Sequence, residues 1–189
     1  MEIAPREIGI GHEEWAPGRL SQRDRLQHRY GRTCPWVAGD DGGRRDKRAR
    51  DVGTLALDSS GMIVAGTSTS GWAMRLPGRV SDSSVIGAGN YANEAGASSS
   101  TGLGEYAIRH NLTRKVCDRL GVGYQPTEAC EETLKEMLRR EKVGFILALI
   151  ALDRHGQVGG ATTKESFIYQ YQRLSDRSLT RVTPTPVSV

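Results

Sequence analysis

Apolar and polar positions alternate most regularly after residue 50. Two short strand-like runs, 52–57 and 62–67, flank the sequence DSSG at 58–61. This pattern predicts a β-hairpin with Gly61 at a positive φ. The Gly-rich stretch 85–91 predicts a short strand or a buried loop.

A helical period follows. Ile108, Leu112, Val116 and Leu120 recur every four residues, and they predict a helix over 106–120 that Gly121 ends. A second helix is predicted over 128–140, with Thr127 as its N-cap. Its apolar face consists of Cys130, Leu134, Met137 and Leu138.

Three further strands are predicted, over 143–152, 157–163 and 166–171. The resulting order places two helices between antiparallel strands. That order favours an α+β fold with layered sheets. No internal repeat is evident.

Residues 1–50 lack apolar periodicity and end in the charge run GDDGGRRDKRARD. They hold 11 Lys and Arg against 8 Asp and Glu, so most of the net charge of +4 lies there. We expect a poorly ordered basic leader over 1–50, a hydrolase-like domain over 51–174 and a frayed tail over 175–189. A basic arm for nucleic acid or membrane, or a loop exposed to proteolysis, are the alternatives for the leader.

The remaining composition excludes several classes. The three cysteines, Cys34, Cys117 and Cys130, have no metal-ligand spacing, and their odd number argues against a closed disulfide framework. No apolar run reaches about 18 residues, and the start has no secretory pattern. As written, the chain is expected to be cytoplasmic, or lysosomal or periplasmic if its true N-terminus lies further upstream.

The candidate chemistry lies between residues 51 and 105. Arg79 and Asp82 are three residues apart and suit the two charged ends of a zwitterion. The Gly-rich sequence STGLGE at 100–105 precedes a helix, where free N–H groups attract anions. Ordinary explanations exist for each feature alone: a surface ion pair, a tight turn, or hydroxyls in a strand.

Taken in order, four blocks resemble the Thr-nucleophile asparaginase family, which comprises glycosylasparaginase, isoaspartyl peptidase and taspase. They are GTSTSG at 66–71, PGRVSDS at 77–83, IGAGNYA at 86–92 and STGLGE at 100–105. The resemblance extends over about 51–171 and matches the β-subunit of these N-terminal nucleophile hydrolases. SFIYQY at 166–171 is closer to glycosylasparaginase.

The resemblance implies an αββα sandwich and a precursor that cleaves itself before a nucleophilic Thr. Thr69 would orient the nucleophile, and Thr101 with the N–H of Gly102 would form the oxyanion hole. The substrate pocket would be formed by the remaining matched positions: Arg79 for the α-carboxylate, Asp82 for the α-ammonium, and Val80, Ser81, Leu103 and Gly104.

The chain departs from the family pattern at the cleavage site. Asp51 is followed directly by Val52, so the Thr is expected to be deleted between these two cleavage-site neighbours. Thr54 is a weak substitute, because its offset along a strand directs it to the opposite face. Ser81 replaces a family glycine, and most of the α-subunit half of the sandwich has no counterpart before Asp51.

The leading hypothesis is an amidohydrolase that cleaves the side-chain amide of asparagine derivatives after autoproteolysis: N4-glycosylasparagine, asparagine or isoaspartyl peptides. The alternative is a truncated, inactive relative that keeps an aspartyl-binding site. A nucleic-acid-binding module is the third and weakest hypothesis. The expected partner is a small-molecule substrate, without cofactor, metal, nucleic acid or membrane, and the resemblance implies an oligomer if the chain is processed.

Overall fold

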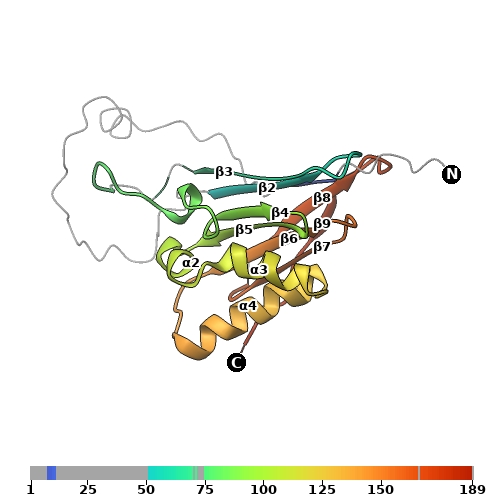
Figure 1. Cartoon of the computed structure of the whole chain (residues 1–189). Coiled ribbons are helices and arrows are strands. Elements are labelled where there is room, and N and C mark those ends of the chain that lie inside the picture. Colours follow the sequence, from blue (N-terminus) through green and yellow to red (C-terminus); the bar gives the residue numbers. More distant parts are fainter. Residues whose placement is uncertain (1–7, 12–50, 70, 72–74, 166, 189) are drawn as a thin grey trace.

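The described part of the protein has three layers. The computed structural model describes residues 8–11, 51–69, 71, 75–165 and 167–188. Three helices cover one face of a four-stranded sheet, and a five-stranded sheet lies against its other face (Figure 1). Helices and antiparallel sheets in one domain confirm the predicted α+β class.

The five-stranded sheet is antiparallel throughout. Its strands follow the order β3 (Ile63–Thr69), β2 (Asp51–Leu57), β1 (Ile8–Gly11), β8 (Tyr169–Arg173) and β9 (Thr180–Val182). The β2–β3 hairpin confirms the sequence prediction: the N–H of Asp58 donates to the carbonyl of Met62 over 3.0 Å, and Gly61 has a φ of 87°.

Two chain ends differ from expectation. Ile8–Gly11, within the predicted leader, forms a strand between β2 and β8, and its alternating Ile-Gly sequence suits such a position. The predicted frayed tail includes β9, and Val187 is buried and donates its N–H to the carbonyl of Thr162 over 2.7 Å. The predicted disorder of 12–50 lies outside the described residues.

The four-stranded sheet follows the order β4 (Asn90–Asn93), β5 (Gly96–Gly102), β6 (Leu147–Asp153) and β7 (Val158–Thr162). The β4–β5 hairpin was missed, because β5 (GASSSTG) has no strand-like apolar residues. Its buried serines instead donate to backbone carbonyls: Ser98 to Ile150 over 2.8 Å and Ser99 to Gly89 over 3.0 Å. Hydrogen bonding of this kind makes burial of polar side chains tolerable.

The helices are α2 (Gly104–His110), α3 (Leu112–Gly121) and α4 (Pro126–Arg140). The single helix predicted over 106–120 is wrong, because Asn111 adopts a left-handed conformation (φ 49°) and divides it into α2 and α3. Helix α4 begins earlier than predicted. Gln125, not Thr127, is its N-cap, and Pro126 occupies the first turn, where its missing N–H costs nothing.

Strand β6 connects the two cores, because both of its faces are buried. Leu147, Leu149 and Ala151 pack against the helices, whereas Ala148, Ile150 and Leu152 pack against the five-stranded sheet. A strand that is buried on both faces has a continuous apolar sequence instead of an alternating one. The outer face of the five-stranded sheet remains exposed, with Thr54, Ala56 and Val64 on it.

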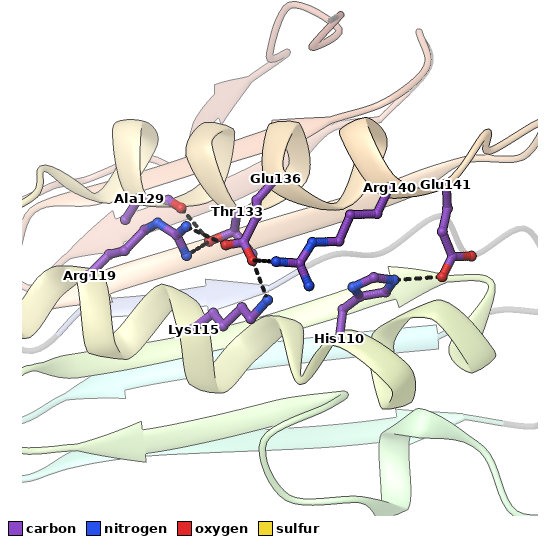
Figure 2. A network of polar contacts seen from close by, with 8 residues as sticks. All are labelled: His110, Lys115, Arg119, Ala129, Thr133, Glu136, Arg140 and Glu141. Atoms are coloured by element: carbon purple, nitrogen blue, oxygen red, sulfur yellow. Dashed lines mark hydrogen bonds and ion pairs between the residues drawn. The ribbon is translucent and has the colours of Figure 1, made fainter.

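Charged side chains join α3 to α4 (Figure 2). The side-chain nitrogens of Lys115 and Arg119, both in α3, each lie 2.8 Å from a different carboxylate oxygen of Glu136. A guanidinium nitrogen of Arg140 lies 3.5 Å from the same carboxylate. Arg119 also donates to Thr133 over 3.0 Å. Beyond the helix end, His110 contacts Glu141 over 2.9 Å. These contacts fix the helical layer from its solvent side.

None of the described helices is long and apolar enough to cross a membrane.

Candidate active site

Side chains from three strands meet at one end of the two sheets. Asp51 begins β2, Thr69 ends β3, and Thr101 lies near the end of β5. The Thr69 hydroxyl donates to Oδ1 of Asp51, and the Thr101 hydroxyl donates to Oδ2 over 3.1 Å. The Asp51 carboxylate is therefore held between the two threonines that the sequence assigned to catalysis.

The register of β2 shows which residue lies beside the two threonines. The β2–β3 pairing runs without interruption from Asp51 opposite Thr69 to Leu57 opposite Ile63. Gly53 keeps this register against β5, because a Cβ there would lie 2.2 Å from Oγ of Ser99. The residue beside Thr69 and Thr101 is thus Asp51 itself. A carboxylate occupies this position in the structure, and the expected deletion of a Thr between Asp51 and Val52 remains a prediction.

A pocket of about 280 Å³ opens beside Thr69. Its lining is mostly hydroxyls and cations: Thr67, Thr69, Gly71, Arg75, Arg79, Ser81, Ser83 and Ser84. Asn90 orients part of this wall, because its amide donates over 3.1 Å to both the Thr67 hydroxyl and the Ser83 carbonyl. The pocket therefore suits a small polar ligand that carries negative charge.

Two arginines supply the positive charge. Arg79 is mostly buried and contacts Glu105, at the start of α2, over 3.4 Å. The Arg75 side chain lies beside Gly71, whose N–H donates to the Thr69 hydroxyl over 2.7 Å. A planar guanidinium can bind a carboxylate through two parallel hydrogen bonds. Arg79 lines the pocket, its contact with a substrate carboxylate remains a prediction, and Arg75 is a second candidate.

Asp82 lies behind the pocket wall rather than in it. Its side chain is 2% exposed and accepts hydrogen bonds from the hydroxyls of Ser81 (2.7 Å) and Ser100 (3.4 Å). Burial raises the pKa of its carboxyl; the Ser81 hydrogen bond lowers the pKa, and the nearby charge of Asp51 raises it. Its predicted contact with a substrate ammonium remains a prediction.

Two glycines near Thr101 and Asp82 lie in close contact with neighbouring atoms. Gly102 has a φ of 120°, and a Cβ there would lie 2.1 Å from the carbonyl oxygen of Ile146. A Cβ on Gly104 would lie 2.5 Å from Oδ1 of Asp82. Only glycine fits both positions. Gly102 thus lets β5 pass close to the chain before β6, next to Thr101.

The other predicted residues are distributed around the site. Ser81 lines the pocket, and Val52 is half-buried next to Asp51. Val80 is 65% exposed, and Leu103 packs against the helical core instead of the pocket. Thr54 is exposed on the outer face of β2, three residues from Asp51, so it does not join the cluster.

Sequence reasoning missed several lining residues: Thr67, Gly71, Arg75, Ser83 and Ser84. Arg75 had a usable signal, since it is a cation four residues before Arg79 in an otherwise uncharged stretch. The serines had none, because isolated hydroxyls are common in turns. Among the described residues, no group of three His, Cys, Asp or Glu side chains could hold a metal ion.

Comparison with known proteins decides the family. A family model described as Asparaginase matches residues 12–181, which is most of the chain. The chain belongs to the asparaginase family. This result confirms the resemblance seen in the four sequence blocks, and it extends the matched region upstream of Asp51.

Individual relatives of this asparaginase-family chain agree. It is 42% identical over 111 residues to proteins of Drosophila yakuba and Drosophila melanogaster, both provisionally named N(4)-(beta-N-acetylglucosaminyl)-L-asparaginase. That alignment covers 58% of this chain and 28% of each relative. A plant-type L-asparaginase of Pyrococcus abyssi is 38% identical over 125 residues, 65% of this chain and 39% of the relative. The chain thus spans well under half the length of these relatives.

Proposed function

We propose that this asparaginase-family chain is an amidohydrolase that acts on the side-chain amide of asparagine derivatives, such as N4-glycosylasparagine, asparagine or isoaspartyl peptides. The observation that carries the proposal is the convergence of Thr69 and Thr101 on Asp51, beside a pocket that contains Arg79. The names of the relatives support this substrate class. The helix–sheet–sheet layering supports three of the layers of an N-terminal nucleophile hydrolase sandwich.

Substrate recognition would begin at Arg79. The α-carboxylate of the substrate would take the guanidinium from its weak contact with Glu105, which is 3.4 Å away and largely exposed. A charge-assisted, bidentate hydrogen bond is stronger than such a surface pair. The side-chain amide would then lie towards Thr69 and Thr101, with the Thr101 hydroxyl available to polarise its carbonyl.

The residue at position 51 determines which group can attack the amide carbon. Self-cleavage of the family type requires a hydroxyl at this position, which Asp51 does not provide. We propose instead that Asp51 accepts a proton from a water molecule as the oxygen of that water adds to the amide carbon. The same proton would pass to the leaving nitrogen as the carbon–nitrogen bond breaks, giving an aspartyl side-chain carboxylic acid and ammonia or an amine. The new carboxylic acid would then lose its proton to the released amine or to solvent.

The test is release of aspartate from L-aspartic acid β-hydroxamate by the purified chain. Turnover is expected in the native protein, and Arg79→Ala should raise KM about tenfold or more by removing the carboxylate contact. Arg154→Ala is the matched control, because Arg154 is an exposed cation in the β6–β7 turn. No turnover above the buffer rate would contradict the proposal.

One observation favours a second candidate function. Both oxygens of the Asp51 carboxylate already accept hydrogen bonds from threonines, which makes Asp51 a weaker base for activating water, so the site would recognise the ligand without turnover. Binding of L-aspartate or a related amino acid by calorimetry, with no hydroxamate hydrolysis, would support this candidate. The loss of binding in Arg79→Ala would then locate the ligand in the pocket.

A further inference from the structure

The Asp51 carboxylate retains unused hydrogen-bonding capacity. Thr69 donates to one of its oxygens and Thr101 to the other. A carboxylate has about four lone-pair sites, so each oxygen can accept another donor. Asp51 is half-buried, and Thr69 is shared between Asp51 and the pocket wall. A ligand in the pocket therefore lies within one side chain of a negative charge.

Charges of both signs lie around the pocket. Arg75 and Arg79 line the pocket itself. Asp51 lies beyond Thr69, and the buried Asp82 lies near enough to Asp51 for the two carboxylates to interact. A bound amino acid whose carboxylate meets Arg79 would direct its side chain towards Thr69, and thus towards Asp51. Chemistry at the end of that side chain then determines the sign of its interaction with Asp51.

We propose that Asp51 is a specificity-determining residue of this site: it selects amino acids whose side chain ends in an amide or an ammonium group, and it disfavours those that end in a carboxylate. The inference rests on the proposed function. Asp51 would make the site favour the substrate over the product, because the amide substrate can donate an N–H to Asp51 whereas the carboxylate product is repelled. Product release is favoured by the same charge.

The magnitude follows from the separation of the charges. Unit charges a few ångströms apart at a protein surface interact strongly enough to change an equilibrium constant about tenfold or more. Reversing the sign at the end of the ligand changes attraction to repulsion. The preference should therefore be measurable even if salt and water screen part of it.

Two ligands of similar length test the inference without turnover: L-2,4-diaminobutyrate, which ends in an ammonium, and L-aspartate, which ends in a carboxylate. Calorimetric titration of the native chain at pH 7 should show that diaminobutyrate binds about tenfold or more tightly than aspartate. In Asp51→Asn, which keeps the shape but removes the charge, the ratio should fall severalfold.

Asp58→Asn is the matched control. Asp58 lies at the far end of the same hairpin, and its Oδ1 accepts N–H groups from Ser60 and Met62, which an asparagine oxygen can also accept. It changes net charge equally and should leave the ratio unchanged. The ratio in the native chain depends on no variant, so misfolding of Asp51→Asn would not remove the test.

The outcomes separate this inference from the function beneath it. Aspartate that binds the native chain as tightly as diaminobutyrate would overturn the selectivity of Asp51 and leave amino-acid recognition intact. A preference that survives in Asp51→Asn would also overturn it, because another group would then be responsible. Absence of binding by both ligands, together with absence of hydroxamate turnover, would overturn the proposed function and this inference with it.

Discussion

Thr101 donates a hydrogen bond to Oδ2 of Asp51 over 3.1 Å, although the two residues lie fifty positions apart in the sequence. This bond joins the five-stranded sheet to the four-stranded sheet at the end where the pocket opens. Asp51 is thereby fixed by both sheets, since Thr69 of β3 holds its other oxygen. A carboxylate and two hydroxyls therefore meet at this point.

Thr54 should be dispensable. Its side chain is exposed on the outer face of β2, so Thr54→Ala should change the free energy of unfolding by less than about 0.5 kcal/mol and leave ligand binding unaltered. Thr69→Ala, which removes a donor to Asp51, should weaken binding of diaminobutyrate. Calorimetry on both variants makes the comparison. Loss of ligand binding in Thr54→Ala would show that Thr54 contributes to the site.

Gly102→Ala should destabilise the fold by about 2 kcal/mol or more, because the new Cβ would meet the Ile146 carbonyl at a φ of 120°. Gly66→Ala is the control. Gly66 is exposed on β3, and a Cβ there would have no other atom within 4 Å, so its effect should stay within about 0.5 kcal/mol. Urea denaturation measures both. Equal free energies of unfolding for the two variants would show that the close contact between β5 and the segment before β6 relaxes easily.

Asp82 should make stability fall as pH rises. Burial raises the pKa of its carboxyl above the ordinary value of 3.8, so the folded state binds more protons than the unfolded state just above that pH. Stability is therefore lost as pH rises from 3.8 through the folded-state pKa. In Asp82→Asn this decline should disappear.

Thermal denaturation across that range measures the effect for native and Asp82→Asn proteins. Ser100→Ala is the control, because it keeps the Asp82 carboxylate and its hydrogen bond from Ser81, while it removes the Ser100 bonds to Asp82 (3.4 Å) and to the Ala88 carbonyl (2.9 Å). The same slope in native and Asp82→Asn proteins would assign the pH dependence to another group.

Glu136 should have the opposite pH dependence. Hydrogen bonds from Lys115 and Arg119 lower the pKa of its carboxyl from 4.5 to about 2. Its contribution to stability is fully present above 4.5 and is lost as pH falls towards 2. Glu136→Gln should cost about 1 kcal/mol at pH 7, since the network is partly exposed, and almost nothing near pH 2.

The comparison for Glu136→Gln is Glu132→Gln. The Glu132 carboxylate is more exposed, and its pKa is lowered mainly by the hydrogen bond from Lys135. A smaller loss of thermal stability is expected for this variant. Equal losses at pH 7 and pH 2 in Glu136→Gln would indicate that packing, and not charge, joins α3 to α4.

The sequence by itself determined the local elements and the family. Gly61 predicts the β2–β3 turn because it can adopt a positive φ, and the apolar run before Asp153 predicts a buried strand. The four ordered blocks carried the family assignment, and Arg79 is in the pocket as its position suggested. These features depend on residues close together in the chain.

Only the tertiary structure decided what depends on distant partners. Strand β5 carries serines in place of apolar residues and was not predicted, and its burial is explained only by backbone carbonyls of other segments. Asn111 divides a regular helical period through its left-handed φ of 49°, although α2 and α3 pack into the same core. The same holds for Asp51. Its sequence context suggested a missing threonine, whereas strand register places its own carboxylate between Thr69 and Thr101.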